Sequence, residues 1–223
     1  MSAEVDPEVC FMNVPSADEF ERVMVQRHTR PVYEKLKAAK AAVAGLGGLG
    51  SNIAISLARA GIGNLLLVDF DRVDLTNLNR QQYDICDIGM YKTDALKRKL
   101  RNINPYTEVR TVTVKVDECN APEIFSEYGI VCEAFDGAQS KAMLINTLLD
   151  KCPDTFIVSG SGMAGMLSSN TIITRRAFDH LYICGDGVTD MNDVNGLMAP
   201  RVAICANHQA NMVLRLIMGL YDV

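Results

Sequence analysis

Three glycines, Gly45, Gly47 and Gly50, form a G-x-G-x-x-G pattern between an apolar segment and a segment with helical periodicity. Glycines so spaced allow a tight turn and a close approach of the backbone to phosphate, which then faces the N–H groups that open the helix. Asp69 follows Gly50 by nineteen residues and ends the next apolar run, where a carboxylate can accept hydrogen bonds from ribose hydroxyls. The loop, which also contains Gly48, therefore predicts nucleotide binding without distinguishing ATP from NAD or FAD.

A dense group of polar side chains follows Asp69, where the second strand is expected to end. This group comprises Asp71, Asn77, Asn79, Arg80 and Gln81. Lys92 opens the next expected helix, and Asp136 ends a later expected strand near the same edge of the sheet. Taken singly, the cations are typical of solvated surface charges. Together they can neutralise a triphosphate while a carboxylate holds Mg²⁺, so the group favours chemistry at a phosphate over hydride transfer.

The elements that must position these residues alternate between strands and helices. Apolar or β-branched runs predict strands at residues 41–44, 65–68, 109–116, 130–135 and 155–159. Helical spacing predicts helices over 17–40 (interrupted at Arg30–Pro31), 51–60, 92–102, 138–150 and 200–220. Short strands at 170–174 and 181–184 and a Gly-rich loop at 185–199 precede the last helix.

This order implies an α/β fold with a Rossmann-like, doubly wound, mostly parallel sheet, helices on both faces and a short antiparallel C-terminal extension. We expect residues 1–16 to form an N-terminal arm and residues 17–223 to form a single domain. The length of 223 residues with 48% hydrophobic side chains suits one sizeable core and leaves no room for a second full domain.

Composition narrows the class of protein. The formal net charge of −5 argues against a general nucleic-acid-binding surface. The seven cysteines form no CxxC pair, which indicates reduced thiols and a cytoplasmic location. The acidic N-terminal segment has no apolar core of a secretory leader, and no run of about 18 apolar residues predicts a membrane span.

Several separate segments occur in the order and spacing typical of the ThiF/MoeB/E1 superfamily, whose members adenylate ubiquitin-like proteins. These segments are Gly45–Gly50, Asp69–Asp71, Thr76–Gln81, Ile88–Gly89 with Lys92, Ile103–Pro105 and Gly196–Pro200. The chain resembles this superfamily from about Gln26 to its C-terminus. Within the superfamily it is most similar to a short ThiF branch of thiamine biosynthesis.

The resemblance implies a role for each matching residue. The Gly45–Gly50 loop would hold the phosphates of ATP, and Asp69 would bind the ribose. Three side chains would contact the phosphates and stabilise charge as pyrophosphate leaves: Asn77, Arg80 and Lys92. Gln81 would support them, and Asp136 would ligate Mg²⁺.

The implied partner is a small ubiquitin-fold sulfur carrier ending in Gly-Gly, whose terminal carboxylate would attack the α-phosphate of ATP. The resemblance also implies a homodimer in which an N-terminal arginine reaches the neighbouring subunit's ATP. Arg27 is the best match for this arginine, and Arg30 competes with it. We place a cover over the carrier tail in the loop at 185–199. Relatives often hold zinc with two CxxC pairs, but Cys184 has no nearby partner cysteine, so we expect no zinc site.

Other interpretations remain open at this stage. Cys184 could take up the acyl group or sulfur, although a small buried residue is the favoured interpretation. A tRNA threonylcarbamoyladenosine dehydratase-like activity is disfavoured by the net negative charge. An NAD-dependent oxidoreductase would need a substrate domain for which the chain leaves little length. An inactive partner subunit is disfavoured by the presence of Arg80 and Lys92.

Overall fold

A seven-stranded sheet with strand order β3-β2-β1-β4-β5-β7-β6 forms the centre of the protein. The computed structural model describes residues 14–190 and 196–223. Its strands are β1 (Lys40–Ala44), β2 (Asn64–Val68), β3 (Glu108–Val112), β4 (Ile130–Glu133), β5 (Phe156–Gly160), β6 (Ile173–Phe178) and β7 (Leu181–Gly185). All neighbours pair in parallel except β6, the outer strand, which runs antiparallel to β7. The Rossmann-like sheet with its antiparallel extension is confirmed.

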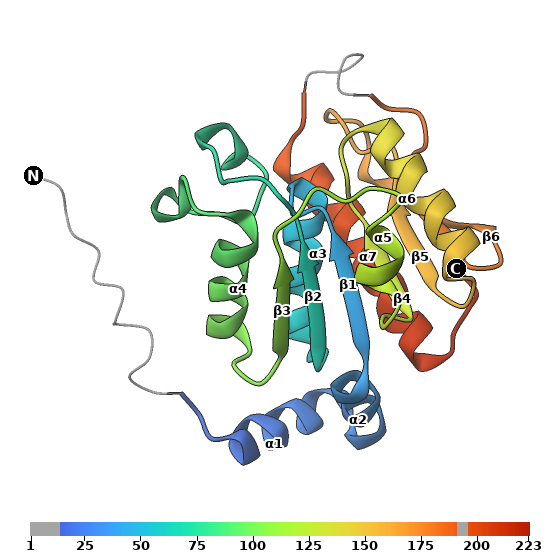
Figure 1. Cartoon of the computed structure of the whole chain (residues 1–223). Helices are drawn as coiled ribbons and strands as arrows, with labels where there is room; N and C mark the ends of the chain where they lie inside the picture. The colour runs from blue at the N-terminus through green and yellow to red at the C-terminus, as the bar shows by residue number, and fades with distance from the viewer. Residues whose placement is uncertain (1–13, 191–195) are drawn as a thin grey trace, which may run out of the picture.

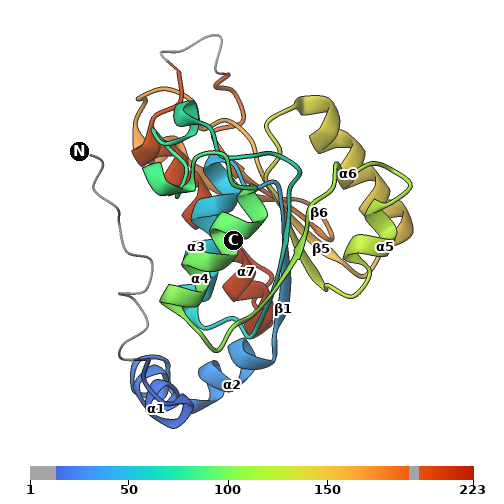
Figure 2. The ribbon, with the colours of Figure 1, turned by 60° about the vertical axis from the view of Figure 1, so that its left-hand side comes forward.

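The helices lie on both faces of this sheet and at the amino ends of its strands. They are α1 (Ala17–His28), α2 (Arg30–Ala38), α3 (Gly48–Ala60), α4 (Lys92–Ile103), α5 (Ala121–Phe125), α6 (Ala138–Lys151) and α7 (Ala199–Met218), with the short 3-10 helices η2 (Leu75–Asn77), η3 (Ile85–Asp87) and η4 (Ser169–Thr171). α3, α4 and α7 cover one face, and α5 and α6 cover the other (Figures 1 and 2). α1 and α2 lie at the amino ends of the strands, at the bottom of Figure 1.

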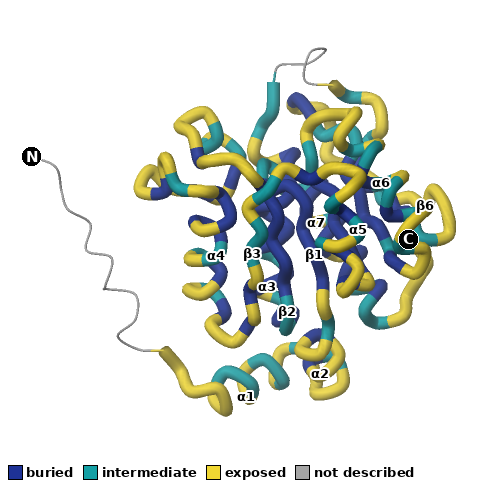
Figure 3. Tube along the Cα trace, in the orientation of Figure 1, coloured by how far each residue is buried: buried dark blue, intermediate teal, exposed yellow. Residues whose placement is uncertain are grey.

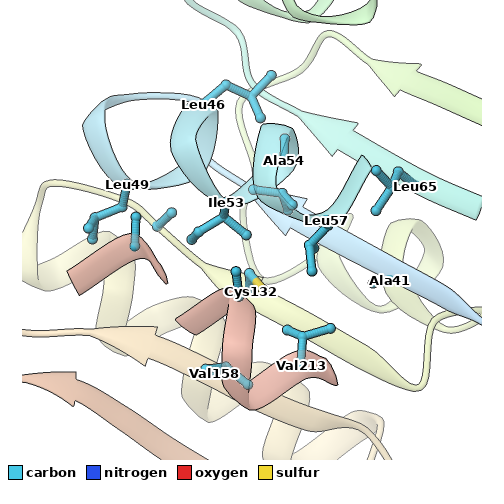
Figure 4. Packing of buried hydrophobic residues seen from close by; sticks show 14 of the residues in the cluster. Ala41, Leu46, Leu49, Ile53, Ala54, Leu57, Leu65, Cys132, Val158 and Val213 are labelled. Carbon is cyan, nitrogen blue, oxygen red and sulfur yellow. The ribbon is translucent and has the colours of Figure 1, made fainter. Parts of the chain in front are cut away.

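Two apolar layers hold the helices on the sheet. The side chains of Ile53 and Leu57 on α3 face those of Val158 on β5 and Val213 on α7 (Figure 4). On the opposite face, Phe125, Leu144 and Leu148 pack against the same strands. The central strands are buried while the outer helix surfaces are exposed (Figure 3), as expected for a parallel sheet covered on both sides.

Two strands end earlier than the sequence predicts, because side chains capture the backbone. The predicted strand at 109–116 leaves the ladder after Val112, and the Asn120 amide donates to the Lys115 carbonyl at 3.0 Å. The predicted strand at 130–135 ends at Glu133, whose carboxylate accepts the Phe135 N–H at 2.8 Å. The released segments then run along the carboxyl edge of the sheet.

Other boundaries differ from the prediction by a few residues. α3 begins at Gly48, inside the glycine loop, instead of at residue 51. The predicted strand at 170–174 begins at Ile173, because η4, capped by the Ser168 hydroxyl, occupies the preceding residues. α5 was not anticipated. Within the predicted loop at 185–199, residues 191–195 lie outside the described residues.

The N-terminal arm predicted at residues 1–16 also lies largely outside the described residues, which begin at Val14. Ser16 caps α1, its hydroxyl oxygen accepting from the Glu19 N–H at 3.2 Å. Among residues 14–190 and 196–223, no helix has both the length and the apolar character needed to cross a membrane.

Candidate functional site

A cavity of about 680 Å³ lies at the carboxyl edge of the sheet, at the top of Figure 1. Its position matches the point where the strand order reverses between β1 and β4, which is where open α/β sheets bind ligands. One part is lined by the glycine loop and by residues following β2, β3 and β4, and we call it the glycine-loop half. The other part, the distal half, is lined by residues 161–164, 189–190, Leu197 and Val202.

The glycine loop needs glycine for two different reasons. Gly45 has a φ of +87°, which side chains rarely adopt, and a Cβ at Gly50 would lie 1.8 Å from the Gly45 carbonyl oxygen. These two residues make the turn tight. Gly47 and Gly48 line the cavity together with Gly45, and the α3 N-terminus that begins at Gly48 directs backbone N–H groups toward it. The loop therefore presents an anion-binding helix terminus.

Asp69 is a buried carboxylate that fixes the end of β2 beside this loop. It accepts the Leu46 N–H at 2.6 Å and the Asp71 N–H at 2.8 Å. Burial raises the pKa of Asp69, although these two hydrogen bonds and the nearby Lys92 charge oppose the increase. Because it also lines the cavity and each oxygen has a further lone pair, Asp69 can accept hydrogen bonds from a ribose there.

Two cations stand on the wall of the glycine-loop half. Lys92, the first residue of α4, has a side chain only 8% exposed, and its Nζ lies 3.0 Å from an Asp71 carboxylate oxygen. The Arg80 side chain passes over Gly48, where an added Cβ would meet its Cγ at 3.4 Å. Arg80 donates to the Thr76 carbonyl at 3.2 Å. An ammonium and a guanidinium thus line one wall of the cavity.

Two further residues selected from the sequence line the same half. The Gln81 side chain is buried, and its Oε1 has no hydrogen-bond partner within the described chain. An unpaired buried acceptor is costly, so this amide beside the cavity is a candidate partner for a bound ligand. Asp136, which follows β4, is exposed on the opposite wall and offers a carboxylate to a cation.

Other residues selected from the sequence lie outside the described cavity lining. The Asn77 side-chain oxygen accepts the Asp74 N–H at 3.1 Å and closes η2. Arg27 lies in the last turn of α1, at the end of the sheet opposite the cavity (Figure 1). Arg30 pairs with Glu21 at 2.8 Å on the same side. Within one chain, neither arginine lies near the glycine loop.

The sequence interpretation missed a buried polar cluster below the cavity floor. The Glu133 carboxylate is fully buried at the end of β4 and pairs with Lys141 Nζ at 2.5 Å. It also accepts from the Ser159 hydroxyl at 2.6 Å. Lys141 itself lines the cavity, as does the exposed Lys115. A glutamate inside an otherwise apolar strand is the one sequence signal that requires a nearby counterion.

The distal half was anticipated only through the loop predicted at 185–199, which supplies Thr189, Asp190 and Leu197, and its other walls come from distant parts of the chain. Its residues Ser161 to Ala164 follow β5, and Thr189 and Asp190 follow β7. The Asn79 amide donates to the Leu197 carbonyl at 3.2 Å and links this half to the segment that carries Arg80. The glycines at 160, 162 and 165 were the available signal for a backbone lining a ligand site.

Among the described residues, Cys184 and the carboxylates of Asp84 and Asp87 offer little free ligand capacity. Cys184 is fully buried, and burial raises the pKa of its thiol to about 11. Among the described residues, the ligand-type atoms that gather within metal-binding reach belong to Asp84, Cys86 and Asp87. Both carboxylates of this group already pair with cations, Lys99 and, for Asp87, also Arg98.

Comparisons with known proteins agree with this geometry. The sequence model of the ThiF family matches residues 21–222. The adenylyltransferase and sulfurtransferase UBA4 of Scheffersomyces stipitis is 34% identical over 194 residues, covering 84% of this chain and 43% of that protein. The molybdopterin-synthase adenylyltransferase of Haemophilus influenzae is 42% identical over 113 residues, covering 50% of this chain and 46% of that protein.

Among solved structures, E. coli tRNA N6-threonylcarbamoyladenosine dehydratase in complex with ATP superposes with a TM-score of 0.81 at 22% identity. The match covers 93% of this chain and 98% of that chain. At this identity the likeness concerns the fold. The chain spans about half the length of the curated relatives it matches.

Proposed function

Because the chain belongs to the ThiF family, we propose that it is an adenylyltransferase that activates the C-terminal glycine carboxylate of a small ubiquitin-fold sulfur carrier. The family resemblance drawn from the sequence is thereby confirmed. The curated relatives named above are adenylyltransferases, which supports the same activity here. The finer assignment to a ThiS-like carrier of thiamine biosynthesis is part of the proposal and rests on the sequence resemblance.

The observation that carries the proposal is the continuity of the cavity. Its glycine-loop half combines an open helix N-terminus, the buried Asp69 carboxylate and the cations Arg80 and Lys92. Its distal half continues from there along the backbone of residues 161–164. A nucleotide in the first half would leave the second for another reactant. ATP bound to the dehydratase of the same fold supports this placement of the nucleotide.

The proposed reaction needs little beyond positioning and charge neutralisation. A carboxylate oxygen of the carrier attacks the α-phosphorus of ATP, the bond from that phosphorus to the bridging oxygen breaks, and pyrophosphate leaves with the electron pair. A glycine carboxylate is already ionised at neutral pH, so no general base is required. Arg80 and Lys92 would offset the repulsion between two anionic reactants and the charge that develops on pyrophosphate.

The residues present fit a bound Mg²⁺. Asp136 supplies an exposed carboxylate on the cavity wall, and hard oxygen ligands of this kind, together with phosphate oxygens, are what Mg²⁺ prefers. When bound, the ion would neutralise phosphate charge. The chain's own Lys115 adds positive charge to the same cavity, whereas the charge of Lys141 is paired with that of Glu133.

We also propose that the active form is a homodimer in which Arg27 of one subunit approaches the other subunit's nucleotide. The proposal rests on the sequence resemblance and fits the structure, because Arg27 lies at the end of the sheet away from its own cavity (Figure 1). Arg30 is the less suitable of the two arginines, since it pairs with Glu21 and approaches Glu34.

Carrier-dependent ATP–pyrophosphate exchange tests the activity. The purified chain is incubated with Mg-ATP, labelled pyrophosphate and recombinant ThiS-type and molybdopterin-type carriers that end in Gly-Gly. The matched control is each carrier lacking its last glycine. We expect exchange only with an intact tail, and an acyl-adenylate of the carrier visible by intact mass.

Two further experiments test the alternative functions. Exchange absent with every carrier, together with ATP hydrolysis stimulated by tRNA, would replace the proposal with adenylation of a tRNA-attached carboxylate. Thermal protection by NADH without protection by Mg-ATP would point to an oxidoreductase. Exchange that survives Arg80→Ala at the parental rate would contradict the role given to the cationic wall.

A further inference from the structure

We propose that the buried ion pair of Arg201 and Asp186 is a positioning device for the distal half of the cavity, and thereby for the carrier tail. The proposal rests on the proposed function for the identity of the tail. The pair joins the segment 184–187 to the residue that directly follows the segment 196–200, and the nucleotide site leaves both segments unexplained.

Arg201 lies in the first turn of α7 and is 3% exposed. Its guanidinium donates to the carbonyls of Leu167 at 2.8 Å and Ser168 at 2.6 Å. It also donates to the Thr171 hydroxyl at 3.0 Å and to an Asp186 carboxylate oxygen at 2.6 Å. One side chain thus fastens both the segment after β5 and the segment after β7 to the start of α7.

Asp186 links Arg201 to the wall of the distal half. Its carboxylate accepts the N–H groups of Val188 and Thr189, each at 2.9 Å, and the Thr189 hydroxyl. Burial alone would raise the pKa of Asp186, but these donors and Arg201 outweigh it and leave the pKa lowered. The group therefore stays ionised at neutral pH, and it holds Thr189, a lining residue of the distal half.

The opposite wall is packed directly against this carboxylate. A Cβ at Gly162 would lie 2.0 Å from an Asp186 oxygen, and Gly162 has a φ of +77°. The Asp186 N–H donates to the Gly162 carbonyl at 2.9 Å, and the Gly187 N–H donates to the Ser161 carbonyl at 3.0 Å. The backbone that lines the distal half after β5 therefore depends on where Asp186 is held.

The glycine-loop half is held by other contacts. Asp69 binds the Leu46 N–H, the Tyr83 hydroxyl donates to the Leu46 carbonyl at 2.8 Å, and Lys92 pairs with Asp71. None of these involves Arg201 or Asp186. Loss of the buried pair is thus expected to displace one half of the cavity and to leave the other in place.

The test compares Arg201→Met with Arg215→Met. Arg215 lies on the same helix and pairs with Asp222 at 2.6 Å, but this pair is exposed, at 30% and 80%. The second variant, in case Arg201→Met does not fold, is Arg201→Lys. It keeps the positive charge but loses the planar guanidinium that donates to several acceptors at once. The readouts are hydrogen–deuterium exchange, the Kd for Mg-ATP, and the KM and kcat for the carrier that supports exchange.

For Arg201→Met or Arg201→Lys we expect faster deuterium uptake in residues 160–171 and 185–190, with unchanged uptake in 45–60. The carrier's kcat/KM should fall by roughly 10- to 100-fold, because a small misplacement of reactants has an effect of that order. The Kd for Mg-ATP should stay within about twofold, since the glycine-loop half keeps its contacts. Arg215→Met should match the parent.

Unchanged deuterium uptake in both segments would overturn the proposal, as would faster uptake spread equally over the glycine loop. A Kd for Mg-ATP that weakens as much as the carrier's kcat/KM would also contradict it. If the parent protein shows no exchange with any carrier, the proposed function fails. The positioning role is then still decided by the deuterium uptake and the Mg-ATP affinity.

Discussion

The two halves of the cavity are built on different principles. In the glycine-loop half, contacts among residues 45–92 shape the wall, and the cationic residues Arg80 and Lys92 line the cavity. Around the distal half and below the cavity, charged groups are buried and paired with other side chains, as in Glu133 with Lys141 and Arg201 with Asp186. The cations of the glycine-loop half can contact a ligand, whereas the buried ion pairs Glu133–Lys141 and Asp186–Arg201 stabilise the fold.

The largest expected effect that tests this contrast concerns the Glu133–Lys141 ion pair below the cavity. Lys141→Met leaves the fully buried Glu133 carboxylate without its cation. Breaking one side of a buried pair costs roughly 3–5 kcal/mol, so the free energy of unfolding should fall by that amount in urea denaturation at neutral pH. Glu133→Gln added to Lys141→Met should recover part of the loss, because the buried charge is then gone.

The matched control for this variant is Lys151→Met on the same helix. Its pair with Asp150 is exposed, at 63% and 71%, so the free energy of unfolding should change by no more than about 0.5 kcal/mol. Equal losses of unfolding free energy for Lys141→Met and Lys151→Met would show that the Glu133–Lys141 pair does not stabilise the fold. The contrast drawn above would then fail.

The next largest effect concerns Lys92, a cation on the wall of the glycine-loop half. Lys92→Met should lower the rate of pyrophosphate exchange by about 10²–10³-fold, the range found when one preorganised donor to a developing charge is removed. Stability should change less than in Lys141→Met, because the Asp71 side chain is 49% exposed and becomes hydrated. Lys97→Met on the same helix is the control. A large loss of stability with normal kcat would reverse the assignment.

Much of the glycine-loop half could be predicted from the sequence, because its residues stand at recognisable positions: a turn with spaced glycines, the end of a strand and the start of a helix. Gly45 and Gly50 are required by a turn of six residues, and Asp69 by the end of the adjacent strand. Lys92 could be selected because a helix that starts at that edge directs its first residue there. The overall sheet followed from the alternation of strands and helices.

Of the distal half, only the loop at 185–199 was anticipated, because the ion pair that holds this half joins Arg201 to Asp186, and no local sequence pattern relates these two residues. A single arginine in the first turn of an amphipathic helix, such as Arg201, is typical of a solvated charge until the partner Asp186 is placed beside it. Lys141 is close to Glu133 in sequence, but a lysine in an amphipathic helix does not by itself reveal that its partner is buried. The early ends of β3 and β4 depend on side-chain hydrogen bonds from Asn120 and to Glu133, which no apolar periodicity reports.

A third prediction separates the two uses of glycine in the loop. Gly50→Ala places a methyl 1.8 Å from a backbone oxygen, which no rotamer change relieves, so the free energy of unfolding should fall by about 3 kcal/mol or more. Gly47→Ala meets only Gln81 Nε2 at 3.8 Å and should cost about 1 kcal/mol through a weaker N-cap.

Thermal or urea unfolding of both variants, with and without Mg-ATP, distinguishes packing from ligand contact. Gly47→Ala should lose more of the stabilisation that Mg-ATP provides than its small loss of stability would suggest, because Gly47 lines the cavity. Equal losses of stability for the two variants would mean that the loop is not held as tightly as the Gly45–Gly50 contact requires.

The smallest expected effect concerns Cys184 on β7, the strand that leads into the distal half. Cys184→Ala should leave carrier-dependent exchange unchanged, because the thiol is fully buried and burial raises its pKa to about 11. A thiol that accepts an acyl group or sulfur must be accessible and form a thiolate near neutral pH. Cys184 instead packs beside Thr174 and Cys205, so its replacement should cost only about 1 kcal/mol of stability.

Non-reducing gels and intact mass of the chain with its carrier and Mg-ATP provide the check. If a dithiothreitol-sensitive adduct forms, it should persist in Cys184→Ala and disappear in a variant that lacks the exposed Cys86 and Cys119. An adduct that vanishes in Cys184→Ala alone would require the distal half to open far enough to expose its core. Groups buried there would then serve chemistry as well as structure, and the division between the two halves would fail.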